Sequence, residues 1–280
     1  MRELRTDLII EAVRDLCIEA CYVLPNDLCE SFCKAKEMEK SPVGQSIFDV
    51  MIENADYAKT AGIPACQDTG MAVVFAEIGQ DLHIVGCDFE EAINEGVRRG
   101  YIEGKLRLSV VRDPLDRVNT NDNTPAILHT RIVPGDKLSI TVAPKGFGSE
   151  NMSAMKMFKP ANTAEDVCDF VVECVSKAGS NPCPPVVVGV GLGGTIERAA
   201  YCAKHALTRE IGSVNPDPMY AELERKTLEK INALGIGPQG LGGTVTALAV
   251  HFEQHATHIA GLPCVVNMGC HITRHASVVL

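Results

Sequence analysis

The spacing of hydrophobic residues changes near residue 62. Before this point apolar positions recur every three or four residues, as they do along one face of a helix. We therefore predict three helices, of which the first is capped by Thr6 and the third covers residues 42–61, between Ser41-Pro42 and Gly62. The apolar positions of the first run are Leu8, Ile9, Val13, Leu16, Cys17, Ala20 and Cys21.

After residue 62 the pattern becomes that of strands mixed with helices. Met71–Ile78 and Leu82–Cys87 are short, apolar and rich in β-branched residues, and Phe89–Tyr101 has helical spacing. Ala126–Val133 and Lys137–Ala143 alternate like strands paired with each other around Pro134-Gly135-Asp136. Further along, the spacing predicts helices at 163–178, 196–209 and 218–233, with strands at Pro185–Val190 and Thr244–Val250.

These elements predict a mixed α/β (α+β) fold with an N-terminal helical segment and a sheet-bearing body flanked by helices. We place the boundary between residues 1–62 and 63–280, although the chain lacks a linker-like run and also suits a single domain.

Composition narrows the function classes. Lys plus Arg total 26 and Asp plus Glu total 36, so the net charge is 26 − 36 = −10, which argues against nucleic acid or an anionic membrane as partner. No apolar run approaches the roughly 20 residues of a membrane span, and the N-terminus has charges of both signs. We expect a cytoplasmic protein.

The 12 cysteines therefore point to thiols, metal ligands or a cofactor rather than to disulfides. The pairs Cys17/Cys21 and Cys29/Cys33 lie on apolar helix faces, where cysteine behaves as a small hydrophobe. In contrast, Cys66, Cys183 and Cys270 lie in loops rich in Pro and Gly beside predicted strands. Their separations match no short metal signature, but their neighbours leave the thiolates free to face a metal cluster.

A glycine-rich motif, Gly189–Gly194, follows a predicted strand and precedes a helix, with Glu210 further on. This pattern is typical of dinucleotide binding. However, Thr208–Asp217 contains Gly, Asn and Pro and runs into another helix, where that fold requires a second parallel strand. We rank dinucleotide binding second, because the same glycines also suit close approach of the backbone to a cluster or an anion.

His251, His255 and His258 have a spacing that resembles a zinc site on a helix. Glu253 stands one position away from its place in a H-E-x-x-H motif, and the preceding residues alternate like a strand. We therefore expect no shared helical face, and one of the three histidines remains a catalytic candidate.

Two polar runs have the residue types that bind anions. Arg107, Arg112, Arg117 and Asn119–Pro125 suit a substrate carboxylate, because guanidinium presents a planar fork of donors, but they also suit a solvated loop. Lys145–Asn151 suits a small anion nest or an exposed turn. Neither run decides the function alone.

Taken together, seven motifs in order resemble the iron–sulfur class I fumarases and tartrate dehydratases. The resemblance covers most of the chain and is to the α subunit of the two-subunit form, the cluster-binding part of the single-chain enzymes. The motifs are Pro64–Gly70, Leu106–Ser109, Asn119–Pro125, Lys145–Asn151, Gly189–Gly194, His255–Pro263 and Asn267–His271.

The resemblance implies a [4Fe–4S] cluster bound by Cys66, Cys183 and Cys270, whose fourth iron acts as a Lewis acid toward a dicarboxylate substrate. It implies that Gln67, Arg107 and Gly148 bind substrate and that Asp68 and His258 handle protons. The expected reaction is the reversible hydration of fumarate to (S)-malate, a tricarboxylic acid cycle step, with dehydration of L-tartrate as the nearest alternative.

We also expect a partner chain. The sequence ends ten residues after Cys270, whereas single-chain relatives continue into a second catalytic domain, so a separate β subunit is expected, in an α2β2 assembly that alone is active. Two interpretations of other classes remain open, a nicotinamide-dependent oxidoreductase that uses Gly189–Gly194 and a noncatalytic iron–sulfur or zinc assembly subunit.

Overall fold

Two units, each with its own sheet, make up the chain in the computed structural model, which describes residues 2–280. The first unit contains the described residues up to Pro25, Ala55–Gly146 and Arg274–Leu280, and the second contains Asn26–Asn54 and Phe147–Thr273. None of these changes of unit coincides with the predicted boundary near residue 62, which stays a prediction.

The predicted N-terminal helices are present as α1 (Thr6–Tyr22), α2 (Asn26–Met38) and α3 (Pro42–Ala61). The prediction for α3 matches at both ends, because Pro at the first position and Gly62, at φ +62°, are local signals. The predicted capping role of Thr6 is wrong. Arg5 occupies the cap position without a side-chain bond, and the Thr6 hydroxyl instead accepts a hydrogen bond from the backbone N–H of Cys87 at 3.2 Å.

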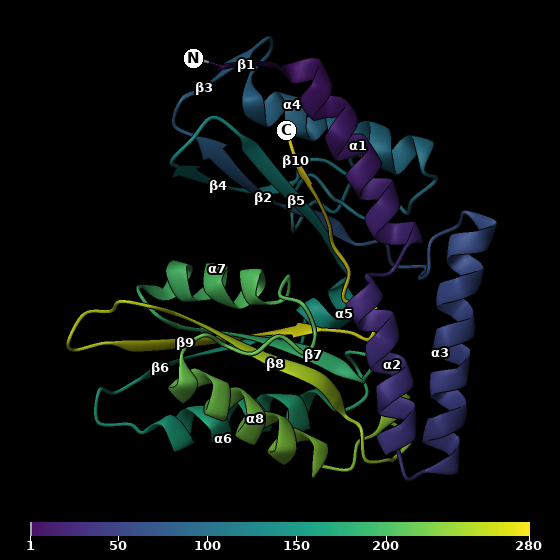
Figure 1. The fold of residues 1–280 in the computed structure, drawn as a ribbon, viewed down its shortest axis with the longest axis vertical. Helices are drawn as coiled ribbons and strands as arrows, with labels where there is room; N and C mark the ends of the chain where they lie inside the picture. The colour runs from purple at the N-terminus through teal and green to yellow at the C-terminus, as the bar shows by residue number, and fades with distance from the viewer. Residues whose placement is uncertain (1) are drawn as a thin grey trace. The chain divides into compact units, whose positions relative to one another are not determined.

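The first unit contains a four-stranded sheet in the order β10-β5-β2-β4 and a parallel pair, β1 with β3. The predicted pairing of Ala126–Val133 with Lys137–Ala143 is wrong, because β2 lies between them (Figure 1). Val74 of β2 stands opposite Leu128 on one side and Val142 on the other. β2, the most continuously buried strand of this unit, thus takes an inner position in the sheet. The strands are β1 (Arg2–Arg5), β2 (Met71–Gly79), β3 (Leu82–Val85), β4 (Ile127–Val133), β5 (Leu138–Lys145) and β10 (Ala276–Val279).

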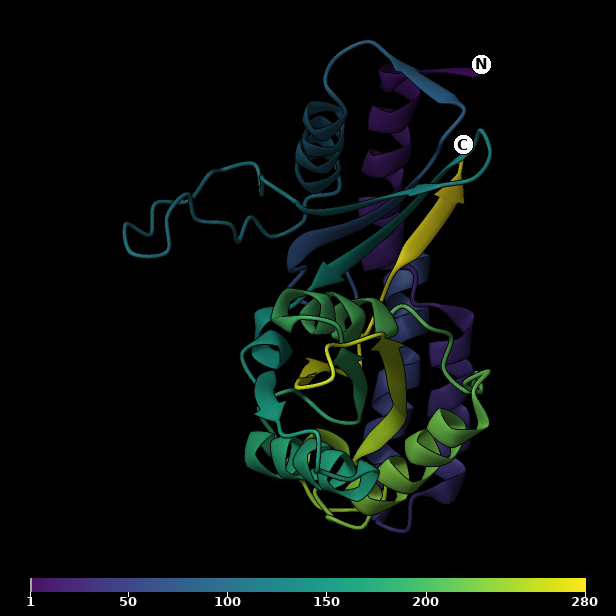
Figure 2. The ribbon, with the colours of Figure 1, turned by 90° about the vertical axis from the view of Figure 1, so that its left-hand side faces the viewer.

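The core of the first unit forms where α1 and α4 (Phe89–Glu103) pack on each other and on this sheet. Gly96 and Gly100 allow α4 to approach α1 closely. A Cβ atom at these positions would lie 2.6 Å from the Cβ of Val13 and 2.7 Å from the Cβ of Cys17. Figure 2 shows the segment between α4 and β4 extending from the sheet of this unit as a long arm.

The second unit is built on a sheet in the order β6-β9-β7-β8, in which β7 and β8 are parallel. Within this unit α6 and α8 cover one face of the sheet and α7 covers the other (Figure 1). The strands are β6 (Ala154–Phe158), β7 (Val186–Gly193), β8 (Ala247–His255) and β9 (Leu262–Gly269). The helices are α5 (Phe147–Glu150), α6 (Ala164–Ala178), α7 (Ile196–Ala206) and α8 (Pro218–Asn232), with a 3-10 turn, η1 (Pro238–Gly240).

The predicted mixed α/β class is confirmed, with helices first and sheets flanked by helices after them. No helix among residues 2–280 combines the length and apolarity that crossing a membrane requires.

Candidate functional site

The loop that carries Cys66, Gln67 and Asp68 is held by buried side chains of the first unit. Ala65 donates its backbone N–H to Cys21 at the end of α1, at 2.9 Å. The single O–H of Tyr101, fully buried on α4, is shared between the carbonyl oxygens of Thr69 and Gly70, at O···O distances of 3.0 and 3.2 Å. Burial raises the pKa of Tyr101 well above its usual value, so the hydroxyl stays a donor.

Arg274 supplies a second side-chain donor, from the C-terminal segment. The residue is 4% exposed, and its Nη2 donates to the carbonyl oxygen of Asp68. The carbonyl oxygens of three successive residues, 68 to 70, are therefore bound by buried side-chain donors. Tyr101 and Arg274 were not predicted to bind this loop. A tyrosine on an apolar helix face and an isolated arginine have no sequence pattern that indicates a bond to a distant carbonyl oxygen.

The Asp68 carboxylate and Arg107 flank this loop. Asp68 Oδ1 accepts the Gly70 N–H at 3.0 Å. The Thr69 hydroxyl oxygen accepts the Arg107 N–H at 2.9 Å, which fixes the Arg107 backbone beside the loop. The exposed Arg107 guanidinium makes no hydrogen bond or ion pair with any residue that the structure describes. The first unit thus brings together Cys66, Gln67, Asp68 and Arg107.

Cys183 and Cys270 lie close together in the second unit. In the β7–β9 register Val187 stands opposite Gly269, so the start of β7 lies beside the end of β9. The carbonyl oxygen of Cys183 accepts a hydrogen bond from the His271 N–H at 3.2 Å. Cys183 has φ +54° and is exposed between prolines, and Cys270 is half-buried.

Gly148 lies in the second unit, in the short helix α5, which is part of the predicted motif Lys145–Asn151. Gly148 is exposed, and a Cβ atom placed on it would meet only the Asn181 carbonyl oxygen, at 3.6 Å. Glu150 anchors this turn, because Lys204 of α7 and Asn267 of β9 both donate to its carboxylate, the latter at 2.9 Å. The predicted anion-binding turn is therefore fixed to the strand that leads to Cys270.

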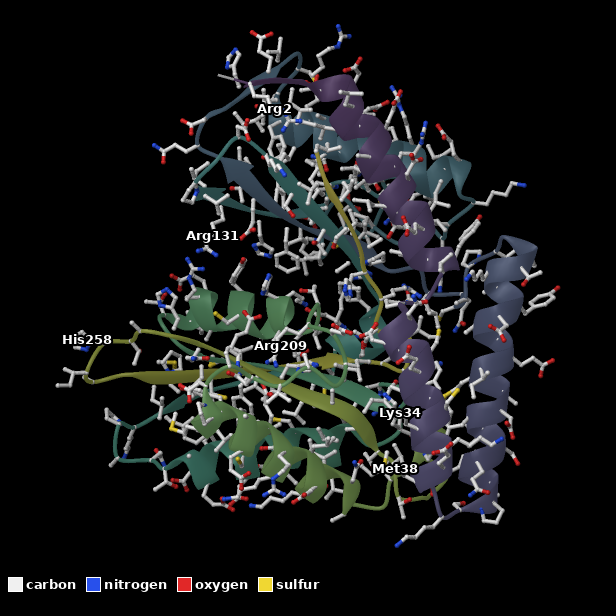
Figure 3. The ribbon with its side chains drawn as sticks, in the orientation of Figure 1. Arg2, Lys34, Met38, Arg131, Arg209 and His258 are labelled. Atoms are coloured by element: carbon white, nitrogen blue, oxygen red, sulfur yellow. The ribbon has the colours of Figure 1, made fainter. Side chains whose placement is uncertain are left out.

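The structure separates His258 from Cys270 within this unit. His258 lies on the exposed loop between β8 and β9, at its tip in Figure 3, and its Nδ1 accepts the Ala260 N–H at 3.1 Å. Cys270 follows the other end of β9, whose eight residues span about 27 Å at the usual rise of a strand. His258 and Cys270 of one chain therefore do not share a site.

The other histidines of the zinc-like motif are also separate. His251 and His255 belong to strand β8, which agrees with the expectation that no helical face joins the three. His251 is 2% exposed, and neither ring nitrogen has a hydrogen-bond partner within residues 2–280. Burial lowers its pKa to about 4, so His251 is a neutral core residue.

The motif Gly189–Gly194 serves the packing of α7 against β7. A Cβ atom at Gly189 would lie 2.1 Å from the Ala203 carbonyl oxygen, and one at Gly191 would lie 1.8 Å from that of Ala199. The backbone of the following helix therefore occupies the space beside Gly189 and Gly191, so close packing of α7 on β7 accounts for these two glycines without a bound dinucleotide.

Six of the nine remaining cysteines are buried, namely Cys17, Cys21, Cys168, Cys174, Cys202 and Cys264. The prediction that Cys29 and Cys33 are both core residues is wrong, because Cys29 is half-buried and Cys33 is exposed, and Cys87 is exposed as well. Burial raises the pKa of Cys174 to about 11 and that of Cys264 to about 12, so both remain protonated thiols at neutral pH. Within either unit no three His, Cys, Asp or Glu residues, as the structure describes them, are grouped to hold a metal ion.

Comparison with known proteins decides the family. The family model for "Fumarate hydratase (Fumerase)" matches residues 10–279. The chain belongs to this family. A protein of Methanocaldococcus jannaschii, provisionally named L(+)-tartrate dehydratase subunit alpha, is 40% identical over 277 residues, which cover 97% of this chain and 95% of that protein.

Members of the fumarate hydratase family from bacteria are also similar. The L(+)-tartrate dehydratase subunits alpha of Escherichia coli K12 and O157:H7 are each 34% identical over 261 residues, or 92% of this chain and 86% of each relative. The chain is thus homologous to α subunits of this family over nearly its whole length, and the family resemblance inferred from the motifs is confirmed.

Proposed function

We propose that this chain is the α subunit of a [4Fe–4S] hydro-lyase that interconverts a hydroxy-dicarboxylate and its dehydrated product. The observation that carries the proposal is the similarity to tartrate dehydratase α subunits over 97% of the chain. The similar chains are named as α subunits, which supports the expected β subunit, and we propose that the two chains form an α2β2 assembly.

The first substrate to test is L(+)-tartrate. The names of the relatives favour tartrate over the fumarate and (S)-malate pair, which the sequence analysis ranked first. The fumarate pair remains the second candidate, because the matching family model is described as fumarate hydratase. Both substrates have two carboxylates and a hydroxyl that leaves as water, so the same binding groups serve either.

The donor set fits an iron–sulfur cluster held by Cys66, Cys183 and Cys270. Thiolates are the ligands that such clusters take, and these three cysteines lie in loops and are at least partly exposed. The Cys270 sulfur also accepts the Ile272 N–H at 3.3 Å, the kind of bond that stabilises a ligating thiolate. When bound, the cluster supplies a Lewis acid to the substrate hydroxyl through an iron without a protein thiolate.

The chain's own residues bind and orient the substrate in this proposal. Arg107 presents its unpaired guanidinium to a carboxylate, and Gln67 and the exposed backbone of Gly148 donate further hydrogen bonds. Asp68 handles a proton, since its carboxylate lies on the same loop as Cys66. His258, placed at the far end of β9 from Cys270, serves the site of a second α chain.

The test is anaerobic coexpression of the chain with its β subunit. We expect an assembly that contains iron and converts L(+)-tartrate to oxaloacetate, that loses activity in air, and that regains it with iron and thiol. Turnover of (S)-malate without turnover of tartrate would replace the first substrate with the second. An iron-loaded assembly that dehydrates neither, or activity indifferent to oxygen and chelators, would refute the proposal.

A further inference from the structure

The arm that joins α4 to β4 begins near Arg107 and comes back to the sheet near Asn123. Asn123 belongs to the polar run Asn119–Pro125 and has no role in the proposed function. Asn123 is fully buried and has a left-handed backbone, at φ +60°. Among residues with a side chain, asparagine adopts this conformation at comparatively low cost. Its burial means that it does not bind a substrate directly.

The Asn123 amide connects two segments of the first unit. Nδ2 donates to the Gly70 carbonyl oxygen at 3.1 Å, at the end of the loop that carries Cys66 and Asp68. Oδ1 accepts the N–H groups of Ser109 and Val110 at 2.7 and 3.2 Å. With the amide turned over, Nδ2 would face the N–H groups of Ser109 and Val110, and Oδ1 would face the Gly70 carbonyl oxygen. The hydrogen-bond partners therefore define one orientation of the amide.

Arg107 is therefore bracketed by two buried contacts. The Arg107 N–H donates to the Thr69 hydroxyl oxygen. The N–H of Ser109, two residues later, donates to Asn123 Oδ1, and Asn123 Nδ2 donates to the Gly70 carbonyl oxygen. The guanidinium has no partner of its own among the described residues, so its direction depends on this backbone. Recognition of a carboxylate by two parallel bonds depends on that direction.

We propose that Asn123 is a positioning residue that sets Arg107 relative to the Cys66–Gly70 loop for binding a substrate carboxylate. This inference rests on the proposed function of Arg107. Asn94 provides a matched control in the same unit, because its side-chain oxygen accepts the Ala126 N–H at 2.9 Å. Among residues 2–280 its side chain bonds neither to Gly70 nor to the residues around Arg107.

The first experiment uses Asn123→Asp in the full assembly with the β subunit. This variant keeps the acceptor for Ser109 and Val110 and loses the donor for Gly70. We expect kcat/KM to fall about 10- to 100-fold, as displaced binding groups typically cause, with iron content unchanged. Asn94→Asp, which also keeps its acceptor oxygen, should lower kcat/KM less than about threefold. Equal effects of the two variants would overturn the proposal.

A double-mutant cycle separates positioning from general destabilisation. If Asn123 acts through Arg107, the double variant Asn123→Asp/Arg107→Lys should be hardly worse than Arg107→Lys alone. The losses from Asn94→Asp and Arg107→Lys should multiply. Independent losses for Asn123 and Arg107 would show that Asn123 has no specific effect on Arg107, and would refute the inference.

Hydrogen exchange gives a readout that needs no activity. In the isolated full chain, Asn123→Ala should speed exchange of the Ser109 and Val110 amides, whose N–H groups bind Asn123 Oδ1, whereas Asn123→Asp keeps that acceptor and should leave both amides protected. Unchanged exchange in both variants would refute the coupling itself. If exchange changes as expected but the assembly with the β subunit dehydrates neither tartrate nor malate, the coupling stands and the proposed function is refuted.

Discussion

The carbonyl oxygen of Cys183 accepts two hydrogen bonds from His271, one from the backbone N–H at 3.2 Å and one from ring Nδ1 at 3.0 Å. Because Nδ1 must carry a hydrogen to donate, the 3.3 Å contact between Nδ1 and Gln239 Nε2 brings two donors together and is not a hydrogen bond. His271 directly follows Cys270, so this residue ties the two cysteine loops of the second unit together.

Replacing His271 with alanine should therefore loosen a cluster bound at these loops. We expect iron loss to a chelator to be about tenfold faster than in the unmodified assembly, as is typical when a residue that orients a ligand is removed. The control is His255→Ala, because the His255 ring bonds only to the neighbouring Ala256 carbonyl, at 2.9 Å. Equal rates of iron loss in both variants would contradict the role of His271.

The proposed ligand set predicts which cysteines are needed for iron binding. Serine at Cys66, Cys183 or Cys270 should abolish the visible absorption of the cluster and lower bound iron, measured after anaerobic purification. Cys87→Ser is the matched control, since Cys87 is also exposed and outside helices and strands, but belongs to none of the motifs. Full iron in one of the three variants would remove that cysteine from the set.

Arg107→Lys tests carboxylate recognition. Lysine keeps the charge and loses the planar fork, so kcat/KM should fall by the equivalent of about 2–3 kcal/mol. Arg112→Lys is the control, because Arg112 lies in the same arm but is exposed and paired with Asp116 at 2.7 Å. If steady-state kinetics of the two variants are alike, Arg107 lies outside the substrate site.

The position of His258 predicts complementation between chains. His258→Ala should keep its iron but lose most activity, because it removes a group from the site of a second α chain. Mixed assemblies of His258→Ala and Arg107→Lys chains should contain sites with both residues intact, and should exceed the activity of either variant assembly alone. Activity no higher than the average of the two parents would refute the proposed sharing.

Glu39 predicts a pH-dependent contribution to stability. It is 2% exposed and accepts the N–H groups of Ser41, Thr244 and Val245 at 2.8 to 2.9 Å. Burial alone would raise its pKa, but these hydrogen bonds outweigh burial and hold the pKa below its ordinary value of 4.5. The carboxylate therefore stabilises the fold above that pH, and this contribution fades as the pH falls through the lowered pKa.

Glu39→Gln should accordingly lower the free energy of unfolding by about 2 kcal/mol at neutral pH, and by less near pH 3. Urea unfolding at the two pH values measures the difference. Glu37→Gln, at an exposed position in the last turn of α2 just before Glu39, should have little effect at either pH. A Glu39→Gln effect that grows on acidification would contradict the assignment.

Local signals explain how much of the fold was predictable. The helix Pro42–Ala61 matches the prediction at both ends, because its start and stop signals act within a few residues. Strand pairing is not local. Ile127–Val133 and Leu138–Lys145 have the pattern of a hairpin, yet each pairs with Met71–Gly79, which comes from an earlier part of the chain.

The family, the mixed α/β class and the loop positions of Cys66, Cys183 and Cys270 could be predicted from the sequence, because these depend on residue identity and on order along the chain. The roles of Gly189, Gly191, Asn123 and His258 became clear only from the three-dimensional structure. Gly189 and Gly191 allow α7 to pack closely on β7. Asn123 hydrogen-bonds to Ser109 and to Gly70, which belong to two separate backbone segments. His258 is separated from Cys270 by the length of β9. Each outcome depends on which atoms fill the space beside a side chain, and residues distant in sequence supply those atoms.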